Sequence, residues 1–440
     1  MKGIQLKFED LDTSSSLEKI LNTDNLRIAF SRVKRNKGAP GIDGKTIEEY
    51  EQNLEEELGQ IRQEVQSWSY KPTPVKRVEI PKPNGKGTRN LGIPIVKDRV
   101  LHMAIKLVIE PILEPTFSKN SYGFRPGRNQ QQAVQEAKRI VESGKEFVVD
   151  IDLSKFFDRI NHDRLIQRLK AHIADTRVLR LIGMILRSGV MIDGIKTPTE
   201  EGSVQGSPLS PLLSNVVLDE LDKELEQRGL EFCRFADDCN IFVKTERAAE
   251  RIMASIKKFI EKKLKLKVNE DKSKTAKSDQ VKFLGMTIVK GTIAISKAAL
   301  NKAMEKVKEL IPRGTNLAIE QAIEKSNSWY RGWASYFKMT EYPSQLKFIE
   351  AHIRRRLRAR IVSQQKKKRN LSAKLIKRGV AKRHANGTVY TNRKTWALSH
   401  TKAVEKAFSN SWFTDILNQV IMSDKILDHW FGQEVWVKLT

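Results

Sequence analysis

The stretch CRFADDCNIFV, residues 233–243, places two aspartates, Asp237 and Asp238, side by side between two apolar segments. The flanking residues are typical of β-strands, so the sequence predicts a strand pair whose turn carries both carboxylates. Adjacent carboxylates repel each other, and burying them without a partner is costly. An Asp-Asp pair is also common in plain surface turns, and this stretch alone favours that interpretation. A third carboxylate elsewhere in the chain changes the balance.

The second apolar stretch, EFVVDIDL at residues 146–153, contains that carboxylate, Asp152, near its end. Its β-branched residues are typical of a strand in a well-covered sheet. If this strand and the 233–243 pair are neighbours in one sheet, three carboxylates meet at its edge. Oxygen ligands suit Mg²⁺, which keeps several waters and takes further ligands from substrate phosphates. The sequence thus predicts that divalent cations relieve the repulsion between Asp237 and Asp238.

The charge of the chain indicates a polyanionic partner. Among 440 residues, Lys and Arg number 80 and Asp and Glu 53, which gives a formal net charge of +27. Nucleic acid is the leading candidate for such an excess. Hydrophobic residues make up 39% of the chain, which excludes a wholly disordered protein, and the length predicts two or three domains.

The basic residues are concentrated between Ala351 and Val404, where no acidic residue occurs. Apolar residues at 349, 353, 357 and 361 recur at helical spacing, so we expect a folded helix with a cationic face. A solvated face or a disordered tail is the alternative, and the sequence favours contact with nucleic acid. The residues expected to make this contact are Arg354, Arg355, Arg356, Arg358, Arg360, Lys366, Lys367, Lys368 and Arg369.

The two cysteines, Cys233 and Cys239, flank the aspartate pair, and the sequence contains no Cys/His cluster with the spacing of zinc ligands. We therefore expect both cysteines to be packing residues. The sequence contains no signal peptide and no apolar stretch long enough to span a bilayer. It predicts a cytoplasmic protein with reduced thiols and no membrane partner.

The hydrophobic pattern predicts an α+β front part and an α-helical, basic back part. KRVEIPKPNGKGTRNLGIP (76–94) predicts a hairpin with its tip at residues 84–85. From about residue 296 the pattern is almost entirely helical. We expect a leader at 1–17, a mixed domain at 18–292, a helical domain at 293–362 and a basic region at 363–440.

Several blocks resemble the reverse transcriptases encoded by bacterial group II introns. FADD within residues 233–243 is similar to their Tyr/Phe-x-Asp-Asp box, and DLSKFFDRINHDRL (152–165) resembles their first catalytic motif. The other blocks lie in the family's order: SYGFRPGRNQQQAV (121–134), VQGSPLSPLLSNVVLDELDKEL (204–225), KVNEDKSK (267–274), KFLGMTI (282–288) and RGWASYF (331–337). The resemblance covers residues 20–440, and the ordered set makes it specific.

The resemblance implies a right-hand polymerase, with fingers, a palm built on an antiparallel sheet, a helical thumb and a basic C-terminal region. It implies that Asp152, Asp237 and Asp238 are catalytic and hold two Mg²⁺ ions, for which Mn²⁺ substitutes, with the Leu153 carbonyl as a further ligand. The residues implied to bind the incoming nucleotide are Lys82, Arg89, Phe157, Gln205 and Lys272, of which Phe157 rejects a ribose 2′-hydroxyl by steric clash. Those implied to contact nucleic acid near the site are Arg125, Arg128 and Phe235.

The implied activity is the copying of an RNA template into DNA from a DNA or RNA primer, with deoxynucleoside triphosphates as substrates. Paired metal ions would activate the primer 3′-hydroxyl and neutralise the leaving pyrophosphate. The resemblance also implies binding of the parent group II intron RNA, to assist splicing and mobility. Phe235 departs from the family's usual Tyr but keeps its aromatic surface. Residues 363–440 contain no cysteine, so we do not expect the family's Cys/His endonuclease domain or cleavage of target DNA.

Two alternatives stay open. A non-catalytic maturase would be an RNA-binding scaffold with a disused polymerase site, although a disused site gains nothing from keeping carboxylates that repel each other. A relative recruited by its host for defence or repair would keep the same polymerase core. Only the DNA that flanks the gene would distinguish that relative from an intron protein.

Overall fold

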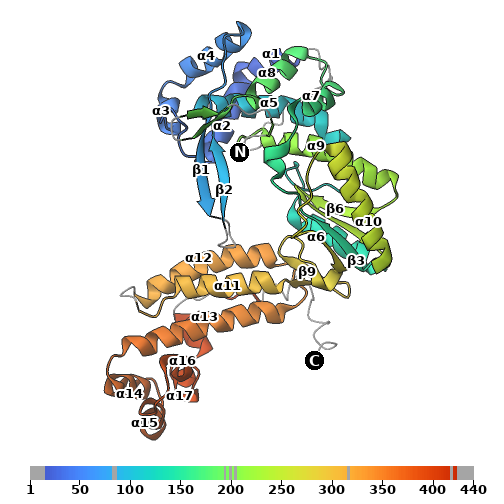
Figure 1. Ribbon diagram of the computed structural model, residues 1–440. Helices are drawn as coiled ribbons and strands as arrows, with labels where there is room; N and C mark the ends of the chain where they lie inside the picture. The colour runs from blue at the N-terminus through green and yellow to red at the C-terminus, as the bar shows by residue number, and fades with distance from the viewer. Residues whose placement is uncertain are drawn as a thin grey trace. The chain divides into compact units, whose positions relative to one another are not determined.

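The computed structural model describes residues 15–81, 87–192, 195–197, 201–202, 206–314, 318–416 and 420–423. The chain divides into two compact units, Met1–Lys277 and Ser278–Thr440. Helices and strands alternate in the first unit, and helices dominate the second (Figure 1). The mixed α+β class predicted from the sequence is confirmed at this coarse level.

The first unit opens with helices that pack around one buried helix, α5 (Val96–Leu113). Four helices precede it: α1 (Ser16–Leu21), α2 (Thr23–Arg35), α3 (Ile47–Gln52) and α4 (Leu54–Gln66). Leu26, Phe30 and Val33 recur at helical spacing on α2 and are buried in the same core as α5. Because α5 is apolar on most sides, it takes the centre of this layer and the amphipathic helices surround it.

A four-stranded sheet adjoins these helices, in the order β2-β1-β4-β5. Strands β1 (Val75–Pro81) and β2 (Thr88–Ile93) form the predicted antiparallel hairpin, whose tip at 84–85 lies outside the described residues. The other two strands are short: β4 (Val190–Ile192), parallel to β1, and β5 (Ile195–Thr197). The hairpin carries Arg89 opposite Ile80 near its outer end.

The central sheet of the first unit is antiparallel throughout, in the order β6-β7-β3-β8. Its strands are β3 (Phe147–Ile151), β6 (Glu231–Phe235), β7 (Asp238–Val243) and β8 (Lys274–Lys277). The helices that pack on it are α6 (Gln130–Glu142), α9 (Ser210–Gln227) and α10 (Glu246–Phe259). Helix α7 (His162–Lys170) packs against α9 and against α8 (Thr176–Leu186). Val149, Ile151 and Ile241 are buried in one core with α9 and α10. Cys233 and Cys239 are buried too, which confirms their predicted packing role.

In its described residues, the second unit joins a strand pair to a set of α-helices. The elements are β9 (Met286–Val289), β10 (Thr292–Ile295), α11 (Lys297–Leu310), α12 (Ile319–Phe337), α13 (Pro343–Gln364), α14 (Lys368–Lys377), α15 (Lys382–Val389), α16 (Thr395–Leu398) and α17 (Lys402–Ala407). The Ile293 N–H donates to Glu341 Oε2 at 2.7 Å, and the Ile295 N–H donates to Gln345 Oε1 at 2.8 Å. These bonds tie β10 to the helices, so the boundary predicted near 292 lies inside this unit. The predicted four-part division stays a prediction.

The sequence predicted that the protein has no membrane partner, and the length and polarity of the helices bear on one part of this prediction. Within the described ranges, no helix is both long and apolar enough to cross a bilayer.

Candidate active site and nucleic-acid interface

The turn between β6 and β7 presents the aspartate pair at one end of the central sheet. Phe235 pairs with Asp238, so Ala236 and Asp237 form a two-residue turn, in which Ala236 has a φ of 57°. On the neighbouring strand Ile151 pairs with Cys239, so the register brings the next residue, Asp152, to the level of Asp238. The predicted adjacency of the two strands is confirmed, and the aspartates lie at the same end of both.

Asp152 is held by the segment 267–274 through its backbone and its side chain. Its Oδ1 accepts a hydrogen bond from Asn269 Nδ2 at 3.0 Å, and its Oδ2 lies 3.4 Å from Lys272 Nζ. Its carbonyl accepts from the Asn269 N–H at 2.8 Å, and its N–H donates to Ser273 Oγ at 3.0 Å. Asn269 and Ser273 were not predicted as site residues, although the block KVNEDKSK contains both.

Asp237 lies in an electrostatic environment shared with Asp152. Burial raises the pKa of the Asp237 carboxyl above its usual value, and the charge of Asp152 raises this pKa further. Arg89 and Lys272 oppose these effects, because their positive charges favour the ionised carboxylate. The two aspartates are therefore near neighbours, and the charges of Arg89 and Lys272 reach the same place.

A metal ion needs several oxygen ligands close together. Among the residues that the structure describes, no three His, Cys, Asp or Glu side chains lie close enough together to hold a metal ion. The three-carboxylate set expected from the sequence is therefore not assembled there, and the exposed Asp238 keeps its role as a prediction. Mg²⁺ needs only one or two carboxylates, with waters and substrate phosphates. Asp152 and Asp237 fit that requirement, and the raised pKa of Asp237 reflects the repulsion that a cation relieves.

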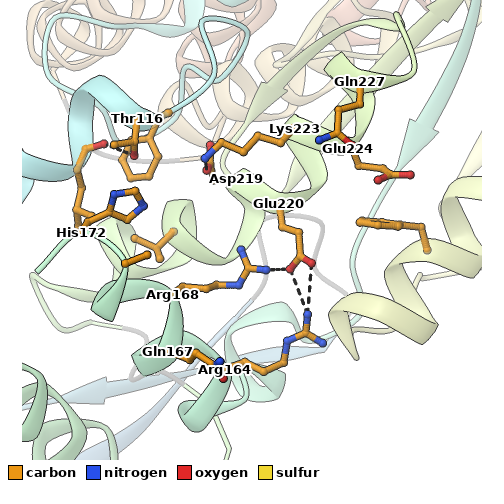
Figure 2. A pocket seen from close by; sticks show the side chains of 15 residues that line it. Thr116, Arg164, Gln167, Arg168, His172, Asp219, Glu220, Lys223, Glu224 and Gln227 are labelled. Atoms are coloured by element: carbon orange, nitrogen blue, oxygen red, sulfur yellow. Dashed lines mark hydrogen bonds and ion pairs between the residues drawn. The ribbon is translucent and has the colours of Figure 1, made fainter.

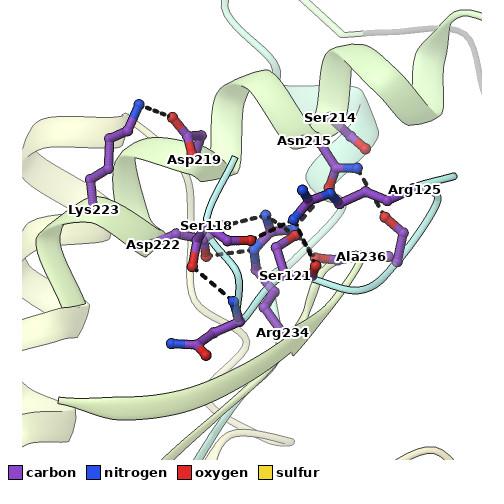
Figure 3. A network of polar contacts seen from close by, with 12 residues as sticks. Ser118, Ser121, Arg125, Ser214, Asn215, Asp219, Asp222, Lys223, Arg234 and Ala236 are labelled. Atoms are coloured by element: carbon purple, nitrogen blue, oxygen red, sulfur yellow. Dashed lines mark hydrogen bonds and ion pairs between the residues drawn. The ribbon is translucent and has the colours of Figure 1, made fainter. Parts of the chain in front are cut away.

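A buried guanidinium, that of Arg234, supports the aspartate turn from within the protein (Figure 3). It donates from Nη1 to the carbonyl of Ala236 at 2.8 Å, and from Nε and Nη2 to Asp222 at 2.7 and 2.5 Å. Further bonds reach Asn215 Oδ1 at 3.0 Å and Ser121 Oγ at 2.8 Å. Neither side chain of the Arg234–Asp222 ion pair is exposed. No sequence pattern indicates this network, because Arg234 has the position of an ordinary strand residue.

The block SYGFRPGR packs directly against the same turn. Tyr122 N–H donates to the Arg234 carbonyl at 2.8 Å. A Cβ on Gly123 would lie 2.2 Å from the backbone nitrogen of Ala236, so only glycine fits there. The Gly123 carbonyl accepts a hydrogen bond from Asn215 at 2.9 Å. This block is therefore part of the support for the turn.

The loop that follows Gln205 lies against the β1–β2 hairpin. Gly206 has a φ of 122°, and a Cβ there would lie 2.3 Å from the carbonyl oxygen of Gly92 on β2. Next to it, Ser207 Oγ lies 2.9 Å from His102 Nδ1. Burial lowers the pKa of His102 to about 3, so the ring is neutral and serves as a hydrogen-bonding anchor. Gln205 itself lies outside the described residues.

The two phenylalanines after Asp152 differ in burial. Phe156 is buried in the core, as the sequence predicts, and Phe157 is half-buried with its ring edge-on to Phe156 at 5.2 Å between centroids. Gly202 lies against this segment, because a Cβ there would be 3.1 Å from the Phe157 carbonyl oxygen. Phe157 is thus a firmly supported ring, and its predicted selection of the sugar stays a prediction.

Arg125 holds the fold together. Its guanidinium is buried, pairs with Glu114 at 2.7 Å and donates to the Ser121 carbonyl at 2.9 Å. Contact with a phosphate needs an exposed cation, and the guanidinium of Arg125 is buried against these partners. The structure therefore does not favour the predicted contact of Arg125 with nucleic acid.

The remaining residues predicted near the site differ in accessibility. Arg128 is half-buried, with its guanidinium 5.4 Å from the centre of the Tyr122 ring. Phe235 is half-buried at the end of β6. Lys82 lies outside the described residues. Their predicted contacts with nucleic acid or nucleotide stay predictions.

The arginines of α13 correct the predicted cationic face. Helix α13 forms as expected, but Arg354, Arg356, Arg358 and Arg360 are buried in the second unit. Arg356 Nη2 donates to the carbonyls of Lys308 and Ile311 at 3.2 and 2.8 Å, and Arg358 Nε donates to the Phe408 carbonyl at 2.8 Å. Carbonyls at helix ends lack partners within their helices, so arginines can satisfy them. The prediction of a solvent-facing arginine stripe was wrong for these four residues.

The accessible part of the predicted basic stretch lies after α13. Lys366, Lys367, Lys368 and Arg369 are all exposed, so their side chains are free to meet a phosphate backbone. Arg355 is half-buried, with its guanidinium 4.2 Å from the centre of the Trp396 ring. The predicted nucleic-acid contacts of these five residues stay predictions.

A cavity of about 800 Å³ in the first unit is lined by charged residues of α7 and α9 (Figure 2). Arg164 and Arg168 pair with Glu220, and Lys223 pairs with Asp219. Because its cations already have acidic partners, this cavity has little unmatched charge to offer a ligand.

Comparisons with known proteins identify two families within the chain. Residues 80–288 match the family described as reverse transcriptase (RNA-dependent DNA polymerase), and residues 300–379 match the group II intron, maturase-specific domain. Protein YkfC of Escherichia coli (strain K12) is 34% identical over 295 residues, covering 58% of this chain and 77% of that protein. Group II intron-encoded protein LtrA of Lactococcus lactis subsp. cremoris is 28% identical over 388 residues, covering 71% of this chain and 64% of LtrA.

Solved structures are also similar to this chain. A partial Cas6-RT-Cas1–Cas2 complex matches with 27% identity and a TM-score of 0.37, covering 56% of this chain and 42% of that chain. The match to YkfC and the order of the two matched domains establish the family. This chain belongs to the reverse transcriptases encoded by group II introns, which are RNA-directed DNA polymerases joined to a maturase-specific domain.

Proposed function

We propose that the chain copies RNA into DNA at a site built on Asp152 and Asp237, within a right-hand polymerase whose palm is the central sheet. The strand register, which brings Asp152 level with the turn that holds Asp237, carries this assignment. The raised pKa of Asp237, caused by burial and then by the Asp152 charge, agrees with it. Two carboxylates held together in a partly buried place need positive charge, which divalent metal ions would supply beside the charges of Arg89 and Lys272.

Mg²⁺ held by Asp152 and Asp237, with Asp238 and the Leu153 carbonyl as further oxygen donors, would supply a Lewis acid for the primer 3′-hydroxyl and the triphosphate. The protein's own cations act on the same substrate. Arg89 and Lys272 are placed to bind the negatively charged triphosphate, because their charges already act on Asp237. Lys272 Nζ lies 3.4 Å from Asp152 Oδ2, so Lys272 would hold a triphosphate beside the carboxylate that would bind the metal.

The pocket for the sugar and base would be formed by Phe157 and the loop at Gly206. A half-buried ring that packs on Phe156 resists displacement, so a ribose 2′-hydroxyl would clash with it. The absence of a side chain at residue 206 lets the loop touch the backbone of β2, the strand that carries Arg89. The hairpin and the loop would therefore act together on one nucleotide.

The catalytic assignment is tested by primer extension on an RNA template with deoxynucleotides and Mg²⁺. Asp237→Asn keeps the size of the side chain and removes its charge, and we expect extension to fall by about 100- to 1,000-fold, as for the loss of a central electrostatic group. Asp163→Asn is the matched control, because Asp163 is an exposed carboxylate of α7. Extension by Asp237→Asn at the rate of the control protein would remove Asp237 from the site.

We further propose that the protein binds its parent intron RNA and assists splicing and mobility. The maturase-specific domain at residues 300–379 and the similarity to LtrA support this role. The test is splicing of a precursor RNA transcribed from the DNA around the gene, with and without protein. We expect faster splicing with both the normal protein and Asp237→Asn, because RNA binding does not need the polymerase site. Splicing that is independent of the protein would contradict the maturase role.

A further inference from the structure

A second cavity, of about 960 Å³, lies in the second unit and is lined by residues of α13, α15, α16 and α17 and of the segments beside them. Its cationic residues are Arg355, Arg383, Arg393, Lys402 and Lys406. They come from five separate points on the chain between residues 355 and 406, and the fold gathers them around one hollow. None of Arg383, Arg393, Lys402 and Lys406 was predicted as a site residue from the sequence.

The charges around this hollow lack acidic partners. In the described part of the chain no Asp or Glu lines it, and Arg383, Arg393 and Lys402 form no ion pair there. The nearest acidic residue in sequence, Glu405, lies 2.7 Å from Nδ1 of His400, a lining residue, and forms no ion pair with the five arginines and lysines within the described residues. The first cavity is different, because Glu220 and Asp219 neutralise its cations. Unpaired like charges repel one another, and a polyanion bound among them relieves that repulsion.

The lining indicates which part of a polyanion would enter. None of the residues that line the cavity is Phe, Tyr or Trp, so it offers no surface on which a base could stack. Part of the lining consists of small residues: Gly387, Ala397 and Ala403. Arg355 lies against the Trp396 ring at 4.2 Å, and its buried Nε has no partner within the described residues. Cationic side chains around small, non-aromatic residues can bind phosphate groups, which carry no sequence information.

We propose that this cavity binds the phosphodiester backbone of a nucleic-acid strand. The inference deepens the proposed function and rests on it, because it identifies where the basic C-terminal region holds the strands on which the enzyme works. Binding is independent of base sequence and sensitive to salt.

The test measures binding of a short unstructured RNA, and of a DNA of the same sequence, to the full chain across a range of salt concentrations. The variant is Arg383→Gln/Arg393→Gln/Lys402→Gln. Since each phosphate contact with a single strand contributes about 0.7 to the slope of log affinity against log salt, we expect that slope to become shallower by about 2, with affinity at least about tenfold weaker at low salt. The control, Lys244→Gln/Arg247→Gln/Arg251→Gln, removes the same number of exposed charges at and before α10.

The outcomes separate the sources of the phosphate. Weaker binding of both strands assigns the cavity to a backbone shared by RNA and DNA, and weaker binding of one strand assigns it to that strand. Equal losses in the variant and the control, or an unchanged slope with both strands, would overturn the proposal. Thermal melting checks that both triple variants stay folded. The assay needs no nucleotide and no catalysis, so extension by Asp237→Asn would refute the polymerase site and leave this result intact.

Discussion

Asp222 on α9 and Arg234 on β6 form an ion pair without exposed surface, and the same guanidinium donates to the carbonyl of Ala236, next to Asp237. The pair therefore links the position of a helix to the conformation of the aspartate turn. Arg234 is a positioning residue, because it acts on the turn through the backbone of Ala236. Its substitution should affect both folding and metal dependence.

For Arg234→Met we expect unfolding to become easier by about 3–5 kcal/mol, because Asp222 is left as an uncompensated buried charge. The double variant Asp222→Leu/Arg234→Met should recover most of this stability but not the bond to Ala236. We therefore expect it to need several times more Mg²⁺ for half-maximal extension. Chemical denaturation and Mg²⁺ titration of primer extension measure the two effects. Arg228→Met, which removes a partly exposed pair with Glu224, is the control and should change neither by much. Normal Mg²⁺ dependence in the double variant would contradict the positioning role.

Replacement of Phe157 should change the choice of sugar. Phe157→Ala removes the ring that would meet a 2′-hydroxyl, so we expect incorporation of ribonucleotides relative to deoxynucleotides to rise by roughly 10- to 200-fold, the range for small steric differences in a pocket. Competition between the two nucleotides in primer extension measures this ratio. Phe156→Leu is the control, since it alters the core beside the ring. If Phe157→Ala discriminates as before, another residue excludes the ribose.

Asp98 should make stability depend on pH in a recognisable direction. Burial raises its pKa to about 6, although Tyr70 Oη and the Thr73 N–H donate to its oxygens at 2.8 and 2.9 Å. Between about pH 4 and 6 the folded protein holds a proton that the unfolded chain lacks, so this group contributes stability at low pH that is lost as pH rises.

We therefore expect Asp98→Asn to lose stability relative to the normal protein as pH falls from 6 to 4. The relative change between pH 6 and 4 should be about 2 kcal/mol, the larger part of the free energy to which a pKa difference of about 2 corresponds. Denaturant unfolding of both proteins at several pH values measures it. Asp163→Asn, at an exposed site, should follow the normal protein throughout. A constant difference between Asp98→Asn and the normal protein would mean that Asp98 titrates normally.

The basic residues of the second unit should divide into two functional groups. Arg356→Met leaves the carbonyls of Lys308 and Ile311 unsatisfied, so we expect a loss of about 1–3 kcal/mol in the free energy of unfolding. Its salt dependence of RNA binding should stay normal. Lys367→Gln/Lys368→Gln/Arg369→Gln should do the reverse, with normal stability and a salt slope shallower by about 2. If Arg356→Met is stably folded and the salt dependence of its RNA binding is weaker, Arg356 contacts nucleic acid and this prediction is wrong.

The sequence predicted the parts of the site that depend on local pattern. Alternating and β-branched residues identified the strands around Asp152 and Asp237, and turn residues identified the 76–94 hairpin. The pattern did not reveal partners joined across long sequence distances, such as Arg234 with Asp222 and Ser121. The prediction that Arg356 is exposed was also wrong. The acceptors of this arginine are backbone carbonyls, which every residue has and which no sequence pattern distinguishes. The number of charged residues in a segment therefore does not show which of their side chains are exposed.

The close approach of Gly123 to Ala236 has a consequence for protein engineering. A designer who transplants the 231–243 hairpin into another scaffold would bring in a backbone that tolerates no atom beyond hydrogen at the facing position. The 120–125 loop must be transferred together with the hairpin, and so must the α9 residue Asn215, which donates a hydrogen bond to the loop. Chimeras that cut between these pieces should misfold at the junction, whereas chimeras that exchange all three should keep the conformation of the aspartate turn.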